Sequence, residues 1–334
     1  LGKNDALVIV DGIEQELSQI NPDDIETVSI LKDASSTAIY GSRATNGVVL
    51  ITTKRAKGSK VQVDYHGYYA IQKSTNVPKM MGLEAYMREQ VVAYTNAGSA
   101  VPARFSEESI QAYVNATDRE KYPLANNWFN TLLRTAPQHY HSLSVAGGNE
   151  TLRTRLSVRY QSQDGVIKNF GNKIGEIRLN SDYNVSKKLR VSADVNYRYS
   201  AAQNPSTNVD QPLNNFFHGS LWAVPKYADG TYGLSTQGNN PLMFIEIGGQ
   251  SKQKTDYLTG YVKADWDIVE GLTFSTQIAG RGLFTQQKNY VNSYTNTDKN
   301  TNITKTIANN NLTEVRNTLR EYTINSLLTY EKSF

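Results

Sequence analysis

The sequence predicts a small α+β unit followed by about eight antiparallel strands of a membrane β-barrel. Three observations carry this prediction. Short strand and helix signals follow one another closely up to residue 54, and from residue 60 apolar and polar residues alternate. The connections between the alternating segments are short and long in turn. A barrel strand points alternate residues to lipid and to lumen, and barrels have short turns at one rim and long loops at the other.

The α+β unit is built from short elements. The Asn21-Pro22-Asp23-Asp24 run is typical of a helix start, with proline early and acids in the first turn. Asp33 is placed to cap a helical turn from Ala34 to Tyr40, which Gly41 could stop in a left-handed conformation. Strands are expected at Ala6–Val10, before the turn Asp11-Gly12, at Val28–Leu31, and at Val48–Ile51, where a continuous apolar run indicates burial on both faces.

The barrel strands are recognised by their alternation. In the first, Val61, Val63 and Tyr65 share one face, while Gln62 and Asp64 share the other. Eight such segments are expected, at 61–72, 140–147, 152–161, 176–185, 189–199, 258–268, 272–281 and 322–334. Long connections at 73–138, 200–253 and 290–318 then lie at one rim, and the first carries helical patterns at 84–94 and 107–116, the second capped by Ser106.

Composition excludes several classes of protein. The net charge of +4 is small and the basic residues are interspersed with acids, so no nucleic-acid-binding stripe is present. Cysteine is absent, which excludes disulfides and thiolate metal sites. No segment approaches the roughly 20 apolar residues of a transmembrane helix. The 21 Tyr against 9 Phe suit a surface that is apolar at one end and wet at the other.

Few residues are patterned for chemistry. His139 and His141 could reach one metal ion, but without a third ligand they are more simply polar residues at a strand end. Asp265 and Asp267 share a face and could imitate a glycosidase pair, although solvated wall charges are the simpler interpretation. No nucleophile elbow, phosphate loop or dinucleotide fingerprint occurs. We therefore expect neither an enzyme nor a cofactor or metal site.

Three aromatic residues of the second long connection are candidates for contact with a substrate or lid. They are Trp222, Tyr227 and Tyr232. Aromatic rings at these positions could stack on sugar rings, or they could pack the loop onto its neighbours, and the sequence favours neither alternative.

A family resemblance is carried by long continuous motifs. The segment LKDASSTAIYGSRATNGVVLITTK and the preceding LVIVDGIEQELSQINPDDIETVSI resemble the last part of the plug domain of SusC/RagA-type TonB-dependent outer-membrane transporters. The block WFNTLLRTAPQHYHSLSVAGGNETLRTRLSVRYQSQDGVI (128–167) resembles the early barrel of that family. The resemblance implies a structural or gating role for a set of plug residues: Asp33, Tyr40, Gly41, Arg43, Asn46 and Gly47.

The resemblance also implies a domain division. Residues 1–59 are expected to form the C-terminal part of the plug, and residues 60–334 the N-terminal part of the barrel. A barrel wide enough to hold a plug needs about 22 strands. Because the chain starts within the plug motif, without a start Met or signal peptide, we expect it to be a fragment truncated at both ends.

The function that the resemblance implies is active import of a nutrient across the outer membrane of a Gram-negative bacterium. The substrate would be an oligosaccharide or, less often, a peptide. The implied partners are TonB, acting through an N-terminal box absent from this sequence, and a SusD-type lipoprotein on the long loops. The alternatives are a siderophore or cobalamin receptor, and a surface glycan-binding protein that does not transport.

The charges suggest how the plug is held. Residues 1–35 carry eight acids and two bases, a net charge of −6. The alternation points Arg153, Arg155 and Arg159 into the lumen. We expect the acidic plug face to dock on this arginine wall, because charges confined in a partly water-excluding lumen attract more strongly than at an open surface.

Overall fold

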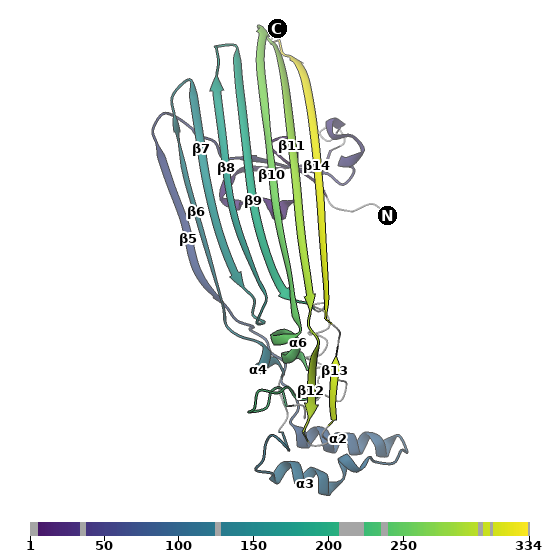
Figure 1. Cartoon of the computed structure of the whole chain (residues 1–334). Helices are drawn as coiled ribbons and strands as arrows, with labels where there is room; N and C mark the ends of the chain where they lie inside the picture. Colours follow the sequence, from purple (N-terminus) through teal and green to yellow (C-terminus); the bar gives the residue numbers. More distant parts are fainter. Residues whose placement is uncertain are drawn as a thin grey trace.

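The computed structural model describes residues 6–33, 38–123, 128–206, 224–234, 240–299, 303–307 and 310–332. A sheet of eight long strands dominates the molecule, and a smaller unit lies against one of its faces (Figure 1). Helices and a short hairpin gather at the end of the sheet where the long connections lie, and the short turns lie at the other end (Figure 1).

The small unit is a four-stranded sheet in the order β2-β1-β4-β3. Its strands are β1 (Leu7–Val10), β2 (Ile13–Glu14), β3 (Ile25–Leu31) and β4 (Val48–Thr53). Asp11 and Gly12 both have positive φ, 48° and 87°, as the tight turn between β1 and β2 requires. The central strand β4 packs against an apolar cluster on each face, as the sequence predicted, one around Val48 and one around Ile51.

Short 3-10 turns replace the helices expected in this unit. They are η1 (Leu17–Gln19), η2 (Pro22–Asp24) and η3 (Ala38–Ala44). Asn21 caps η2, because its side chain accepts a hydrogen bond from the Asp23 amide. The expected turn Ala34–Tyr40 lies partly outside the described residues. Gly41 interrupts η3, as the sequence predicted: its φ of 62° and ψ of −152° are not helical, so the turn before it ends there. Its φ is positive, which glycine adopts readily, but its ψ is not that of the left-handed helical conformation.

The large sheet confirms the eight antiparallel strands predicted from the alternation. Its order is β14-β11-β10-β9-β8-β7-β6-β5, so that β5 and β14 are its two edges. The strands are β5 (Gln62–Gln72), β6 (Ala136–Gly148), β7 (Leu152–Asp164), β8 (Gly171–Asn184), β9 (Leu189–Pro205), β10 (Gly249–Val269), β11 (Leu272–Val291) and β14 (Asn311–Tyr330).

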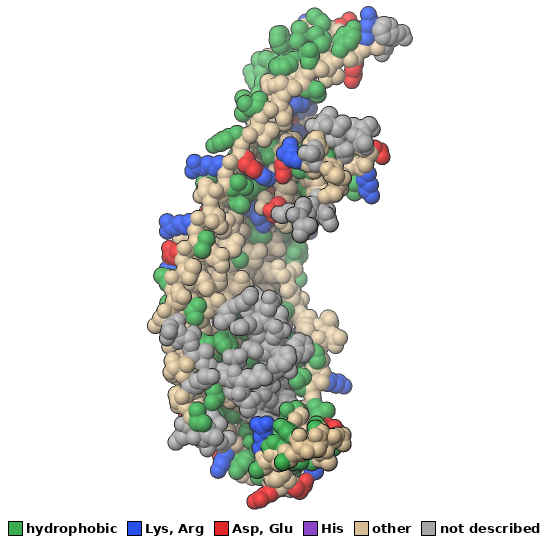
Figure 2. Space-filling view, turned by 90° about the vertical axis from the view of Figure 1, so that its right-hand side faces the viewer, with side chains coloured by type: hydrophobic (Ala, Val, Ile, Leu, Met, Phe, Trp, Pro, Cys, Tyr) green, Lys and Arg blue, Asp and Glu red, His purple; other side chains and the backbone are tan. Residues whose placement is uncertain are grey.

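The two faces of this sheet differ as the alternation predicted. The outer face exposes apolar side chains over the half nearer the short turns, among them Leu143, Val158, Ile177, Val195, Leu258, Val262 and Trp266. The inner face buries polar and charged side chains, among them Arg155, Arg178, Asn180, Asp194 and Gln277. Figure 2 shows the apolar side chains gathered toward the short-turn end. An apolar exterior around a polar interior is the arrangement of a strand in an outer-membrane barrel.

Several strands are longer than the sequence indicated. The strand expected at 140–147 starts at Ala136, and the one expected at 322–334 starts at Asn311 and ends at Tyr330. The long connections shrink accordingly to 73–135, 206–248 and 292–310. The reason is that polar residues occupy both faces beyond the apolar band, so that the alternation disappears while the strands remain paired.

The long connections carry their own elements. The first contains α2 (Leu83–Asn96), η4 (Ala103–Phe105), α3 (Glu107–Asn115) and α4 (Trp128–Leu132). Ser106 caps α3 as predicted, since its hydroxyl accepts from the Ser109 amide. The later connections contain α6 (Pro241–Ile247) and the hairpin of β12 (Tyr294–Asp298) and β13 (Ile303–Ile307). No helix in the described ranges is long and apolar enough to cross a membrane.

Candidate functional site: a polar interface between the small unit and the sheet

The candidate site is the interface at which the small unit, residues 6–59, meets the inner face of the large sheet. Period-two alternation places polar side chains from β6 to β11 on that face, and tight turns of the small unit point carboxylates and carbonyls at them. Two clusters of charged side chains lie in this interface. The small unit contributes the acid to one, which is buried, and the base to the other, which is partly buried.

The first cluster surrounds Asp24 of the small unit. Arg155 Nη1 lies 2.7 Å from Asp24 Oδ1, and the Ser157 hydroxyl donates to Asp24 Oδ2 at 3.1 Å. Arg178 approaches the same carboxylate at 3.7 Å and Asp11 at 3.9 Å. The Arg155 and Asp24 side chains are only 6% and 1% exposed. A buried charge of this kind is stable only when it is paired and hydrogen-bonded, so the contact ties the small unit to the wall.

The second cluster surrounds Arg55, just after β4. Its guanidinium lies 2.8 Å from Asp182 and 2.5 Å from Asp194, and it donates to the Tyr261 hydroxyl at 2.6 Å. Asn180 of β8 donates to Asp194 at 2.7 Å. The small unit therefore contributes the anion in one cluster and the cation in the other.

Further hydrogen bonds join the small unit to the wall. The Tyr140 hydroxyl lies 2.6 Å from an Asp23 carboxylate oxygen and 2.8 Å from the Asn21 amide oxygen, and it can donate to either. Gln277 donates to the Asp11 carbonyl at 2.9 Å. The side chain of Gln277 also covers Gly12 so closely that an added Cβ there would lie 2.6 Å from Oε1. The flexible end of Gln277 could move aside, but the φ of 87° at Gly12 would strain any other residue, so the turn between β1 and β2 favours glycine.

The three arginines of the expected wall have separate surroundings. Arg155 contacts Asp24 of the small unit. Arg159 instead pairs with Glu176 of the neighbouring strand at 2.8 Å, inside the wall itself. Arg153 lines a cavity of about 600 Å³ together with Arg55 and Arg190. Of the three residues named from the sequence, Arg155 contacts the acidic face, and Arg178 contacts it as well.

Arg55, Asp182 and Asp194 were not foreseen as partners. Arg55 opens the basic segment RAKGSK, whose glycine and lysines are typical of a solvated connection. Asp182 and Asp194 fall on the polar side of the alternation in their strands, which is the inner face. Two carboxylates without an assigned cation on a lumen-facing wall were the available signal.

The plug motif borders the interface next to β11 and β14, where Tyr40 and Arg43 line a cavity with Arg281 and Glu321. Arg43 forms an exposed ion pair with Glu14 at 2.9 Å, and Tyr40 packs against the apolar cluster around Val48. Gly47 has φ 90°, and its amide donates to the Ala44 carbonyl. Asp33 and Asn46 flank the same segment, and each interacts with a partner.

The other candidate residues are not arranged for chemistry. His139 and His141 lie on the outer face with ring centroids 5.5 Å apart. Asp265 accepts from Ser275 and pairs with Lys263, and Asp267 accepts from Thr273. Within the described residues, no three His, Asp or Glu side chains are placed to hold a metal ion.

The loop aromatics pack within the loops. Tyr227 and Tyr232 are 6% and 7% exposed, and Tyr232 belongs to an apolar cluster with Met243, Phe244 and Tyr294. This burial favours the packing alternative for both tyrosines over contact with a substrate. Trp222 lies outside the described residues.

Comparisons with known proteins agree with this architecture. Residues 1–48 match the family model of the TonB-dependent receptor plug domain. TonB-dependent receptor P26 of Formosa agariphila is 35% identical over 248 residues, which are 67% of this chain and 24% of that protein. TonB-dependent receptor SusC of Bacteroides thetaiotaomicron is 35% identical over 178 residues, 49% of this chain and 16% of that protein.

A solved structure shares the fold over nearly the whole chain. The RagAB peptide importer in its "open-open" state superposes with a TM-score of 0.71 at 20% identity, covering 96% of this chain and 38% of that chain. The chain thus spans about a quarter or less of the two curated relatives and little more than a third of this structure.

Proposed function

We propose, from the premise that this chain is part of a SusC/RagA-type TonB-dependent transporter, that it supplies the plug and the first wall of a nutrient importer in the outer membrane. Residues 1–59 would belong to the plug and residues 60–334 to the barrel. Transport of this kind makes and breaks no bond in its cargo, so it requires no catalytic residue. The observation that carries the proposal is that two charge clusters hold the small unit on the inner face, one buried around Asp24 and one partly buried around Arg55.

The polar interface supports a plug that is held firmly and can still be displaced. An apolar interface would lose its stabilisation wherever water entered, whereas carboxylates and guanidinium groups are solvated well once they separate. The charged groups therefore act as a latch, and each is re-engaged when the plug returns. We assign the latch to Asp24 with Arg155 and Arg178, and to Arg55 with Asp182 and Asp194.

The loops support capture at the cell surface. The long connections form an ordered platform at one end of the barrel wall, built from α2, α3, α4, α6 and the β12–β13 hairpin (Figure 1). We propose that a SusD-type lipoprotein docks on this platform and delivers an oligosaccharide or a peptide. The RagAB relative is described as a peptide importer.

A disulfide lock tests whether plug movement accompanies import. Thr53 Oγ1 of the small unit lies 3.3 Å from Asn180 Nδ2 of β8, and the chain has no native cysteine. In the full-length transporter, Thr53→Cys with Asn180→Cys should lose uptake when oxidised and regain it on reduction. Thr53→Cys alone is the matched control. Undiminished uptake with the disulfide fully formed would contradict plug movement as a step of transport.

The substrate class and the energy source are tested in the native host. Cells lacking the gene should fail to take up a defined oligosaccharide or peptide pool, and cells lacking TonB should show the same defect. Binding of the pool to cells without TonB-dependent accumulation would instead indicate a surface receptor that does not transport.

A further inference from the structure

The outer face of the sheet carries a group of basic side chains just beyond its apolar band. On β10 the exposed apolar residues are Trp266, Val262 and Leu258, and on the same face the strand continues with Asp256, Lys254 and Lys252. Lys254 lies four residues past Leu258, about 14 Å along the strand. With a barrel tilt of about 40° this is roughly 10 Å above the edge of the apolar band.

Neighbouring strands place further bases at the same height. Lys288 of β11 lies directly opposite Lys252, and Lys173 of β8 is aligned with Lys254 across β9 through Ala201. Arg316 of β14 pairs in register with Gln286, which is itself opposite Lys254. We call these five residues the outer basic patch: Lys173, Lys252, Lys254, Lys288 and Arg316. Figure 2 views the sheet from its side and shows Lys and Arg side chains on the outer face, which points away from the small unit. They lie below the apolar band.

The patch keeps a net positive charge among its neighbours. Like charges directly opposite each other on paired strands destabilise the sheet, yet Lys252 and Lys288 are so placed. Glu314 lies 3.3 Å from Lys288 and 3.8 Å from Arg316, so two bases share one carboxylate. Asp256 accepts from the Tyr197 hydroxyl at 2.5 Å, a neutral partner that does not cancel its charge, and Asp164 pairs with Arg134 at 3.5 Å. Lys173, Lys252 and Lys254 form no ion pair with any residue of the described ranges.

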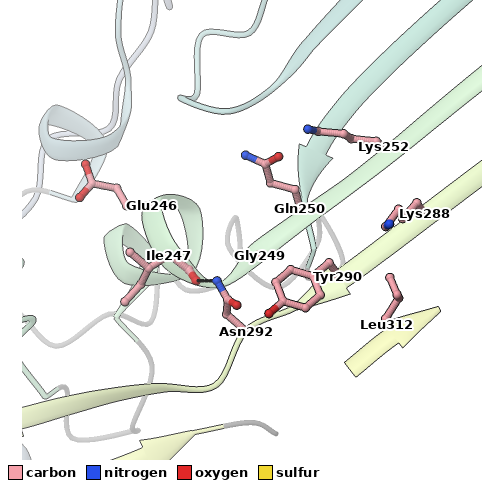
Figure 3. Close-up of a pocket in the computed structure, with 9 residues that line it drawn as sticks. All are labelled: Glu246, Ile247, Gly249, Gln250, Lys252, Lys288, Tyr290, Asn292 and Leu312. Carbon is pink, nitrogen blue, oxygen red and sulfur yellow. Dashed lines mark hydrogen bonds between the residues drawn. The ribbon is translucent and has the colours of Figure 1, made fainter. Parts of the chain in front are cut away.

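A groove adjoins the patch on the loop side. It measures about 600 Å³ and lies where β10 and β11 meet α6. Figure 3 shows its lining, with Lys252 and Lys288 at one side and Tyr290, Leu312 and Ile247 around it. Asn292 donates to the Ile247 carbonyl at 2.9 Å and so closes the end of the groove next to α6. Glu246 also lines the groove, and its carboxylate is paired with Lys168 and Lys226. Since this acid already has two cations as partners, the basic and apolar groups of the groove suit a ligand that is both anionic and amphipathic.

We propose that the outer basic patch binds the phosphate-bearing headgroups of outer-leaflet lipids. Phosphate takes several charge-assisted hydrogen bonds from lysine and arginine, and the patch offers them at headgroup height. Long lysine side chains can reach back toward the interface while their stems cover apolar surface. The patch thereby fixes the depth of the barrel in the membrane and surrounds this part of the wall with bound lipid. The inference depends on the proposed outer-membrane location and is independent of the imported substrate.

Binding of diphosphoryl lipid A to the purified full-length transporter tests the proposal. Each basic side chain near an anionic lipid surface strengthens binding about fivefold, so replacing three should weaken it on the order of 100-fold. The variant is Lys252→Gln with Lys254→Gln and Lys288→Gln, measured in detergent by native mass spectrometry or fluorescence titration. The matched control removes three exposed lysines near the opposite rim, Lys60→Gln with Lys187→Gln and Lys188→Gln, and should bind lipid A like the wild type.

Further arms identify the ligand chemistry. Dephosphorylated lipid A should bind the wild type as weakly as it binds the patch variant, and millimolar inorganic phosphate should not displace lipid A. Equal lipid A binding by the patch and control variants would overturn the proposal, as would displacement by inorganic phosphate alone. If the patch variant instead binds lipid A normally but loses co-purification with a partner lipoprotein, the patch is a protein interface. Uptake measured on the same variants separates this outcome from a failure of the import proposal.

Discussion

Asp24 shows why a single carboxylate can govern the seating of the small unit. It lies in the 3-10 turn η2, held there by Pro22 and by the cap from Asn21, and its side chain is 1% exposed. Both of its oxygens accept hydrogen bonds from the wall, one from Arg155 and the other from Ser157. Removal of the cation would leave a buried carboxylate without its strongest partner, which is more costly than loss of an exposed pair.

Arg155→Gln should therefore loosen the small unit without loosening the wall. The change should cost about 3 kcal/mol or more of seating free energy, because Asp24 stays buried and loses its cation. Amide exchange in β1 and β4 should accelerate, and exchange in β8 to β10 should not, in the full-length transporter measured by mass spectrometry. Arg159→Gln is the matched control, since Arg159 pairs with Glu176 inside the wall. If amide exchange accelerates equally in the plug and in the wall of the Arg155 variant, Arg155 stabilises the wall and does not specifically hold the plug.

Glu246 provides a pH test in the loops. Partial burial acts to raise its pKa, but hydrogen bonds from Tyr232, Lys168 and Lys226 outweigh burial and lower the pKa to about 2, from an ordinary value of 4.5. Because the pKa is lowered, the ionised carboxylate is the form that stabilises the folded loops. Its contribution is complete above pH 4.5, the ordinary pKa, and is lost as the pH falls through about 2.

The expected result is a pH-dependent difference between the wild type and Glu246→Gln. Above pH 4.5 the wild type should protect the amides of α6 from exchange better than the variant, and the difference should vanish as the pH approaches 2. Glu314→Gln, which alters an exposed ion pair on β14, serves as the control. A difference that persists unchanged to pH 2 would show that the ionised carboxylate is not the stabilising species.

At the scale of elements, the α2–α3 hairpin has a core of its own. Leu83, Met87, Phe105 and Ile110 form a buried cluster that shares no residue with the strands. Arg88 pairs with Glu84 within α2 and with Glu107 of α3, which fixes the two helices to each other. The hairpin projects beyond the rest of the loop platform (Figure 1). It is therefore well placed to contact another protein and is not needed to hold the wall together.

Replacing residues 82–116 by a short flexible linker should leave the barrel intact and weaken co-purification of the partner lipoprotein. Intact assembly would be checked by heat-modifiable migration on a gel, and co-purification by affinity capture of the transporter. The control replaces exposed Glu108 and Gln111 by alanine while keeping the hairpin. Unchanged co-purification after removal of the hairpin would place the lipoprotein interface on other loops.

The elements differed in how far the sequence could predict them. Where one face of a strand contacts lipid and the other faces the lumen, apolar and polar residues alternate. The strands around Leu258 and Val195 could therefore be predicted from the alternation alone. Beyond the apolar band both faces are wet, and the extension of β14 from Tyr322 back to Asn311 left no pattern to detect. The pairing of Arg55 with Asp194 could not be predicted either, because it depends on how two separately folded units dock.

At the scale of the whole molecule, the sheet divides into three zones along its strands. The short turns come first, then the exposed apolar band, and then polar strand ends with the outer basic patch and the loop platform. The order of these zones predicts how the sheet is oriented in the membrane. Outer-membrane barrels place their short turns toward the periplasm and their long loops outside the cell. The small unit lies against the inner face, so it occupies the lumen of the barrel that the wall begins (Figure 2).

Cysteine labelling in intact cells tests this direction. This chain has no native cysteine, so once any cysteine outside it has been replaced in the full-length protein, a single substitution reports only its own position. Lys79→Cys and Ser99→Cys lie at exposed positions of the first long connection, and Asn149→Cys and Lys187→Cys lie in short turns. A membrane-impermeant maleimide should label the first two in intact cells, and should label the other two only after the outer membrane is permeabilised. Labelling of the short turns in intact cells, with protection of the loops, would show that the orientation is the reverse. The loop platform would then not lie at the cell surface, where a nutrient must be captured.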